Sequence, residues 1–175
     1  WRFTKDQKGT LKELAWKTDF NDTSWGVVSL PNGLEYLPEE ASGCVNYRGE
    51  AWYRKHFVID QSHSNKRLVL YFEAIMGKSK IWVNGQLVAS HFGGYLPIPV
   101  DISDYVKIGQ ENVIAVWADN SDDPDYPPGK PQNALDFAYF GGIYRDCWLI
   151  STSKLYITDA NQTNIVAGGG LLVGY

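Results

Sequence analysis

The sequence has little cysteine and no long apolar run, and both absences narrow the class of protein. Two cysteines in 175 residues, Cys44 and Cys147, are too few for a disulfide scaffold or a zinc site with paired Cys-x-x-Cys ligands. Spacing does not decide whether they pair; Cys147 lies in an apolar strand pattern and is expected to be a buried reduced thiol. No segment approaches the roughly 20 apolar residues of a membrane-spanning helix, so no membrane span is expected.

An excess of charge of one sign is also lacking. The chain carries 16 Lys and Arg against 20 Asp and Glu, and the two signs are interspersed. Without a basic patch, a nucleic-acid partner is not expected. The chain opens on Trp1-Arg2-Phe3 without an initiator Met or a leader, so we expect it to be part of a longer protein. These features do not fix the location, although we favour a periplasmic or secreted one over a cytoplasmic one.

Helical periodicity is nearly absent, whereas the apolar content is high at 44%. Strand-like runs bounded by Gly, Pro, Asn, Asp or Ser recur at short intervals, which favours an all-β fold over alternating strands and helices. The predicted strands cover 26–30, 51–59, 67–74, 80–83, 86–89, 112–118, 146–150 and 155–158. We therefore predict a β-sandwich of antiparallel strands.

Three sequence patterns give finer expectations for this sandwich. Alternate residues of 67–74 are apolar, and we expect this face to point into the core. It carries Leu68, Leu70, Phe72 and Ala74. The run 112–118 is apolar on both faces, as in a central strand that is covered on both sides. Asn84-Gly85 separates two short runs and predicts a hairpin with a type I′ turn.

Two long segments, 31–49 and 120–142, are predicted loops rich in Tyr, Phe, Asp and Asn. Loops longer than about 12 to 15 residues are usually functional or disordered. Carboxylates and amides bind vicinal hydroxyls, and aromatic faces pack on the C–H patches of a pyranose, so this composition suits a sugar. Asp136, with Phe137 and Tyr139 close by, is the leading candidate; the alternative is an aspartate that caps a turn.

Other catalytic and metal chemistry has little support in the sequence. There is no Gly-x-Ser-x-Gly motif, and the three histidines show no triad or metal spacing. The acidic run 119–125 lacks the twelve-residue pattern of a calcium loop. His91, separated by one residue from the Gly93-Gly94-Tyr95 loop, stays a candidate ligand contact, although a lone histidine is more often structural or exposed.

Several motifs agree with one known family. They are Asp22-Thr-Ser-Trp at 22–25 with Leu-Pro at 30–31, Trp-Tyr-Arg-Lys at 52–55, Trp-Val-Asn-Gly at 82–85, His-Phe-Gly-Gly-Tyr at 91–95 and Gly-Gly-Ile-Tyr-Arg-Asp at 141–146. In this order they resemble the N-terminal sugar-binding domain of glycoside hydrolase family 2. The resemblance implies a jelly-roll-like, galactose-binding-domain-like sandwich. The chain departs from the family at Asn32-Gly33, where many members have His-Asp or His-Thr, and at Cys147, where Val is usual.

The resemblance implies a division of the chain and a role for it. Residues 1–153 resemble the sugar-binding domain, and 154–175 resemble a linker and the first strand of a truncated immunoglobulin-like domain. In the family the two catalytic glutamates lie on a following (β/α)8 barrel, so this chain is not expected to hydrolyse glycosides. The full-length enzyme is expected to be a retaining β-galactosidase, with β-glucuronidase and β-mannosidase as alternatives. Implied partners are a β-galactoside or related oligosaccharide and the enzyme's own barrel and immunoglobulin-like domain.

The resemblance also assigns site residues. Counting back from Gly142-Ile-Tyr-Arg places Asp136 at the family's aspartate that reaches the galactosyl subsite and helps to hold a sodium ion. Asn46 is the nearest match to a second contact, and Tyr139 and His91 complete the candidates. No cofactor is expected within the chain, although sodium or magnesium is expected in the full-length active site. Two rival functions are an independent carbohydrate-binding module and a purely structural packing domain.

Overall fold

The computed structural model describes residues 1–34, 47–137, 140–163, 165–166, 168–171 and 174. Strands dominate, and the helical elements are two 3-10 turns and one short α-helix. In chain order the elements are β1 (Arg2–Asp6), β2 (Gly26–Val27), β3 (Glu50–Val58), η1 (Gln61–His63), β4 (Arg67–Phe72), β5 (Lys78–Val83), β6 (Gln86–Phe92), β7 (Ile98–Asp101), β8 (Glu111–Asp119), η2 (Gln132–Ala134), β9 (Cys147–Thr152) and α1 (Ala160–Thr163). Within the described residues, no helix is long and apolar enough to cross a membrane.

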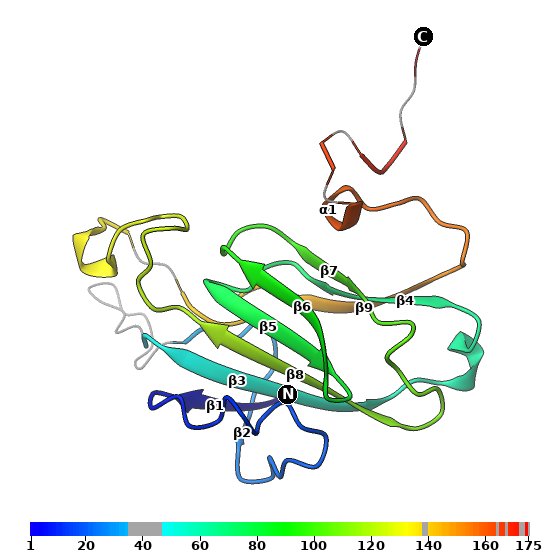
Figure 1. Ribbon diagram of the computed structural model, residues 1–175, viewed down its shortest axis with the longest axis horizontal. Helices are drawn as coiled ribbons and strands as arrows, with labels where there is room; N and C mark the ends of the chain where they lie inside the picture. Colours follow the sequence, from blue (N-terminus) through cyan, green and yellow to red (C-terminus); the bar gives the residue numbers. More distant parts are fainter. Residues whose placement is uncertain (35–46, 138–139, 164, 167, 172–173, 175) are drawn as a thin grey trace.

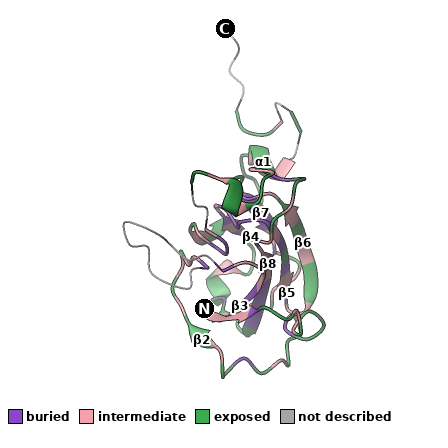
Figure 2. Cartoon of the chain, turned by 90° about the vertical axis from the view of Figure 1, so that its left-hand side faces the viewer, coloured by how far each residue is buried: buried purple, intermediate pink, exposed green. Residues whose placement is uncertain are grey.

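Two antiparallel sheets form a β-sandwich (Figure 1). The larger has the order β2-β1-β3-β8-β5-β6, and the smaller has the order β7-β4-β9. Side chains from both sheets fill the space between them, including Tyr53, Leu70, Phe72, Ile81 and Val116. Figure 2 shows the buried residues concentrated along β3, β5 and β8. The predicted all-β, jelly-roll-like fold is therefore confirmed.

Most of the predicted strands form close to their expected bounds, and the expected faces are confirmed. The predicted inner face of β4 is buried in the core, and β8 lies between β3 and β5 at the centre of the larger sheet. Two strands, β1 and β7, were not predicted. The predicted strand over 155–158 is wrong, because these residues pair with no strand and instead run across the outer face of the smaller sheet.

The β5–β6 hairpin turns at Asn84-Gly85 with φ values of 50° and 80°. Both values are positive, as the predicted type I′ turn requires. The Asn84 side chain also connects this turn to its neighbours. Its Nδ2 donates to the Tyr105 carbonyl and to Asn112 Oδ1, both at 2.8 Å, and its Oδ1 accepts from Val113 N–H at 3.0 Å. The Asn-Gly pair therefore fixes the hairpin and its attachment to β8.

A buried ion pair holds the segment 7–25 on the outer face of the larger sheet. Arg54 on β3 is fully buried, and its Nε donates to Asp22 Oδ2 at 2.7 Å. Its guanidinium also donates to the carbonyls of Ala15, Lys17 and Phe20. His56 Nε2 lies 2.9 Å from the same Asp22 oxygen. Burial raises the pKa of Asp22, but the hydrogen bonds from Arg54 and His56 outweigh this effect, so the pKa is lowered.

Sequence reasoning did not identify this ion pair, although a signal was present. Arg54 directly follows the apolar run Ala51-Trp52-Tyr53 in the Trp-Tyr-Arg-Lys motif, and alternation places it on the same face as Trp52. A charge at such a position is almost always paired, because an unpaired buried charge is very costly. Its partner, Asp22, lies in the first of the family motifs. Two of the motifs that identify the family therefore meet in one structural contact.

Candidate functional site: the 120–146 loop

The segment between β8 and β9, residues 120–146, is the longest connection between strands in the part of the chain that the structure describes, which here omits residues 138 and 139 (Figure 1). Its first residue, Asn120, is fully buried and fixes the start of the loop. Asn120 Oδ1 accepts from Gly49 N–H at 2.9 Å, and its Nδ2 donates to the Tyr47 carbonyl at 2.7 Å. Farther along, Tyr126 is buried and its hydroxyl donates to the Ser121 carbonyl at 2.7 Å. The loop therefore starts from a rigid base.

Two ion pairs attach the acidic part of the loop to the sandwich. Arg48 Nη1 lies 2.6 Å from Asp122 Oδ1, and Lys78 Nζ lies 2.6 Å from Asp123 Oδ2. The hydrogen bond from Lys78 lowers the pKa of Asp123, and the same bond raises the pKa of Lys78. Both aspartates thus have cationic partners. This pairing explains the acidic run as an anchor for the loop.

The end of the loop is fixed by the Gly141-Gly142 pair. Gly142 has a φ of +83°, and its carbonyl accepts from Met76 N–H at 3.0 Å. A Cβ at this position would press against Tyr53 Oη and lie 2.9 Å from the Asn32 carbonyl oxygen. Asn32 N–H in turn donates to the Ile143 carbonyl at 2.8 Å. Only glycine suits this combination of backbone conformation and close approach.

Asp136 lies between these two anchors and is exposed. It follows η2, and the next side chain, Phe137, is 52% exposed. Among the described residues, no hydrogen bond or ion pair occupies the Asp136 carboxylate. An exposed carboxylate beside an exposed aromatic ring can accept hydrogen bonds from sugar hydroxyls while the ring packs on the sugar's C–H face. The loop ends are fixed, so these groups are presented at a defined end of the sandwich.

The other predicted site residues fall elsewhere. Asn46 and Tyr139 lie outside the described residues, as does Cys44. His91 is on β6 and is half-buried, and burial lowers its pKa, so the ring is neutral at pH 7. It borders a groove that faces residues 160–162, 165 and 166, and Asp136 does not line that groove. The described residues therefore do not bring His91 and Asp136 into one pocket.

The described residues do not form a metal site by themselves. No group of three or more His, Cys, Asp or Glu side chains in this part of the chain is placed to hold an ion. Hard cations such as magnesium take about six oxygen ligands, and Asp136 supplies one carboxylate. The predicted sodium ligand role of Asp136 therefore stays a prediction about the full-length enzyme.

Cys147, on β9, packs against the hydrophobic core as a free thiol. Burial raises the pKa of this thiol to about 12. The reactive thiolate is therefore almost absent at neutral pH, which makes nucleophilic chemistry at Cys147 unfavourable.

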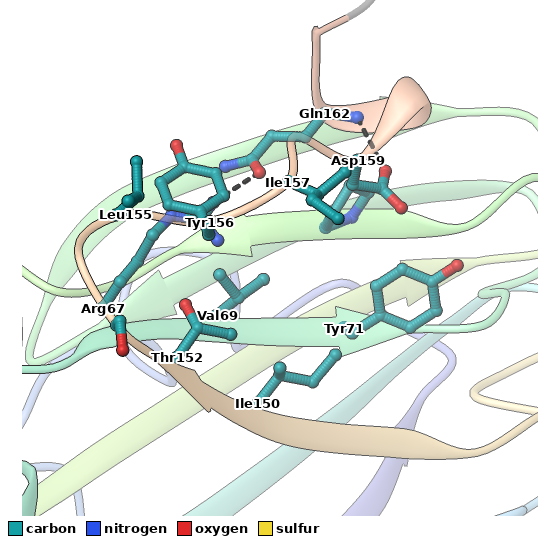
Figure 3. A pocket seen from close by; sticks show the side chains of 12 residues that line it. Arg67, Val69, Tyr71, Ile150, Thr152, Leu155, Tyr156, Ile157, Asp159 and Gln162 are labelled. Carbon is teal, nitrogen blue, oxygen red and sulfur yellow. Dashed lines mark hydrogen bonds between the residues drawn. The ribbon is translucent and has the colours of Figure 1, made fainter. Parts of the chain in front are cut away.

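A pocket of about 380 Å³ lies between the outer face of the smaller sheet and residues 153–162 (Figure 3). Arg67 on β4 connects its two sides: the guanidinium lies 3.9 Å from the Tyr156 ring centroid and donates to Gln162 Oε1. Val69 and Ile150 form its apolar floor. Cover by the segment 153–162 explains why Val69 is buried although it points away from the main core. The contacts identify this pocket as the place where the C-terminal segment rests on the sandwich.

Comparison with known proteins identifies the family of this fold. Residues 6–153 match the model of the glycosyl hydrolases family 2 sugar-binding domain. A β-galactosidase of Thermoanaerobacter pseudethanolicus is 39% identical over 146 residues, which are 83% of this chain and 19% of that protein. A β-glucuronidase of Paenibacillus borealis is 30% identical, with 100% of this chain and 32% of that protein covered.

The same family is found among solved structures. A β-glucuronidase of Bacteroides uniformis superposes with a TM-score of 0.73 at 30% identity, over 87% of this chain and 17% of that one. The chain thus spans at most about a third of the length of these relatives. It belongs to the glycosyl hydrolase family 2 sugar-binding domains.

Proposed function

We propose that this chain is the N-terminal, non-catalytic sugar-binding domain of a retaining β-galactosidase-like enzyme, and that its 120–146 loop completes the galactosyl subsite. In this proposal Asp136 accepts hydrogen bonds from sugar hydroxyls. The catalytic glutamates belong to a barrel in the remainder of the enzyme. The domain supplies binding groups to the active site, and cleavage of the glycosidic bond takes place on the barrel.

The exposure of Asp136 on a loop anchored at both ends supports this proposal. The aspartates at 122 and 123 have cationic partners, whereas no described residue pairs with Asp136. A carboxylate that needed only to cap a turn would accept a nearby backbone N–H, as Asp119 does from Ser121 N–H at 2.9 Å. Asp136 is instead available to a molecule from outside the chain. The similarity to a β-galactosidase supports the choice of substrate.

The test is the kinetics of Asp136→Asn in the full-length enzyme with an aryl β-galactoside. A hydrogen bond to a charged group contributes about 1.5 to 3 kcal/mol, so kcat/KM is expected to fall about 10- to 100-fold. The matched control is Asp125→Asn, which removes another exposed carboxylate of the same loop and is expected to leave kcat/KM unchanged. Equal kinetics for Asp136→Asn and the wild type would refute the role of Asp136.

A second candidate is a β-glucuronidase, because relatives with that name match the same residues. The full-length enzyme assayed with matched aryl β-galactoside and aryl β-glucuronide substrates distinguishes the two. The proposal requires a higher kcat/KM on the galactoside. A preference for the glucuronide would show that the full-length enzyme is a β-glucuronidase. It would not change the proposal that this domain contributes to the sugar subsite.

The rival function, an independent carbohydrate-binding module, predicts that the loop binds sugar without the barrel. Calorimetry of the 175-residue chain with lactose tests this rival directly. A domain that only completes a subsite supplies a few of the contacts to the sugar. Binding of lactose that depends on Asp136 is therefore expected to be too weak to measure in the isolated chain. Lactose binding in the micromolar to millimolar range that disappears in Asp136→Asn would favour the module.

A further inference from the structure

A small pocket of about 190 Å³ lies on the outer face of the larger sheet. Its lining residues are Lys12, Glu13, Trp52, Lys80, Trp82 and Trp117. None of them belongs to the 120–146 loop. The volume is below the roughly 300 to 1,000 Å³ of sites for drug-sized ligands, so the pocket suits a single small ring.

Strand register places the three tryptophans on one face. Trp52 on β3 pairs directly with Trp117 on β8, and Lys80 on β5 pairs with Trp117 from the other side. Directly opposed residues project to the same face of a sheet. Trp82 is two residues beyond Lys80 and therefore shares that face. Three central strands thus build the aromatic wall, which gives the pocket a rigid base.

The aromatic rings differ in exposure. Trp52 is 1% exposed and stacks on Trp82 with ring centroids 5.4 Å apart, whereas Trp82 and Trp117 are half-buried. The segment 7–25 covers part of this face through Leu11, Ala15 and Trp16. Packing against that segment accounts for the burial of Trp52. It does not account for two large indoles that stay partly open to solvent beside a cavity.

Charged side chains surround the rings, and their positive and negative charges are equal in number. Lys12 Nζ pairs with Glu50 and lies 5.7 Å from the Trp117 ring centroid. The Glu13 and Lys80 side chains are exposed, and within the described residues neither has an ion-pair or hydrogen-bond partner, although Lys80 Nζ lies 5.9 Å from the Trp117 ring centroid. The pair at Lys12 is neutral, and Glu13 and Lys80 add one charge of each sign. This balance favours an uncharged ligand that both accepts and donates hydrogen bonds.

The buried indole of Trp52 adds an independent observation. Its Nε1–H is inaccessible to solvent and has no hydrogen-bond partner among the described residues. A buried donor without an acceptor is unfavourable, and native structures rarely leave one unsatisfied. The donor belongs to a side chain that lines the pocket. A small rearrangement that admits a ligand oxygen to the pocket floor would satisfy it.

We propose that this tryptophan pocket binds one pyranose unit of a neutral glycan. The indole faces pack on the C–H patches of the sugar, while Lys80 donates to hydroxyl oxygens and Glu13 accepts from hydroxyl groups. The proposal is independent of the function assigned to Asp136. It gives the domain a second place of contact with carbohydrate, on the face of the larger sheet.

The experiment is a titration of the ¹⁵N-labelled 175-residue chain with methyl β-D-galactopyranoside and with lactose, followed by NMR of the seven tryptophan indole signals. The signals of Trp52, Trp82 and Trp117 are expected to shift in a saturable manner with millimolar Kd. The Trp148 indole, on β9 and 54% exposed, is the internal control and is expected not to shift. Methyl β-D-glucuronide is expected to bind more weakly, because its carboxylate would have to leave water for a pocket whose own charges cancel.

Two variants test the site, and a third separates it from the loop. Trp117→Ala is expected to weaken binding at least tenfold, whereas the matched Trp148→Ala is expected to bind as the wild type does. Lys80→Ala changes an exposed side chain, so it tests the site even where Trp117→Ala does not fold, and it is expected to weaken binding several-fold. Asp136→Asn is expected to leave this binding unchanged.

Three outcomes would overturn the proposal. The first is the absence of saturable shifts up to about 100 mM sugar, far above a millimolar Kd. The second is binding that persists at wild-type strength in both Trp117→Ala and Lys80→Ala. The third is binding that is lost in Asp136→Asn, which would locate the sugar in the 120–146 loop.

Discussion

Asp22 and Asp136 are two aspartates in family motifs or close to them, yet they lie in opposite environments. The Asp22 side chain is 7% exposed and contacts Arg54 and His56. Asp136 is exposed, and no described residue pairs with its carboxylate. Asp22 is thus fully occupied with contacts inside the domain. Asp136 is free to bind something outside it.

The difference shows that a motif identifies a family without saying what each residue does. A buried carboxylate that holds a guanidinium stabilises the fold, and its removal leaves a charge in an apolar environment. An exposed carboxylate on an anchored loop contributes little to the free energy of folding, because water solvates it in both the folded and the unfolded chain. Measurements of stability and of binding should therefore separate the two residues.

Replacing Asp22 with Ala is expected to destabilise the chain by about 3 to 5 kcal/mol at pH 7, because it leaves the buried Arg54 charge without its partner. The free energy of unfolding from urea titration measures this change. Asp125→Ala is the matched control, since Asp125 is an exposed aspartate. Its unfolding free energy is expected to stay within about 0.5 kcal/mol of the wild type.

The Asp22 effect is expected to depend on pH in a defined direction. The folded pKa of Asp22 is lowered from an ordinary value of 3.8, so the unfolded chain takes up a proton first as the pH falls. The stabilisation is fully present above pH 3.8 and is lost as the pH falls toward the folded pKa. The difference between wild type and Asp22→Ala should therefore shrink below pH 3.8. A constant difference from pH 7 down to pH 2 would contradict the ion-pair explanation.

Replacing Gly142 with Ala is expected to destabilise the chain by about 1 to 3 kcal/mol. The substitution places a side chain at φ +83°, in contact with the Tyr53 hydroxyl and the Asn32 carbonyl. Thermal and urea unfolding of the 175-residue chain measure the effect. Gly26→Ala is the control, because its Cβ would meet only Phe3 O at an ordinary 3.6 Å. Equal stabilities for the two variants would show that the Gly142 region relaxes around a side chain.

The sequence was sufficient to predict most of the sandwich, because its strands alternate clearly and their turns carry strong signals. The hairpin at Asn84-Gly85 is the clearest case, since few residue pairs take two positive φ values. The strand β1 was missed because Arg2, Lys5 and Asp6 interrupt the apolar pattern. The strand β7 was missed because it contains Pro99, and proline is tolerated only on edge strands such as this one.

The predicted strand over 155–158 shows the opposite error. Its residues have a strong strand propensity, but a strand forms only where a neighbour offers hydrogen bonds. In the structure this segment lies across the outer face of β4, where Tyr156 stacks on Arg67. The local sequence therefore favours a strand over 155–158, but no strand in the described part of the chain pairs with these residues.

The candidate site was only partly accessible to sequence reasoning. Asp136 was singled out by the composition of its loop and then assigned by its distance from the Gly-Ile-Tyr-Arg motif, and its exposure was not predictable from either. The tryptophan pocket was missed because Trp52, Trp82 and Trp117 are far apart in the chain. Trp52 and Trp82 belong to family motifs, and Trp117 lies in the run 112–118 that is apolar on both faces. Strand register brings them together, and register depends on pairing across the whole sheet.

The smallest expected effect on folding is that of Asp136→Asn. Asn is nearly isosteric with Asp, and no described partner loses a contact, so the unfolding free energy is expected to change by less than about 0.5 kcal/mol. Urea unfolding of this variant alongside Asp22→Ala completes the comparison of the two aspartates. Unchanged stability, together with reduced kcat/KM in the full-length enzyme, would assign Asp136 to binding. A loss of 2 kcal/mol or more would show that Asp136 stabilises the loop, and reduced activity would then no longer be evidence of sugar contact.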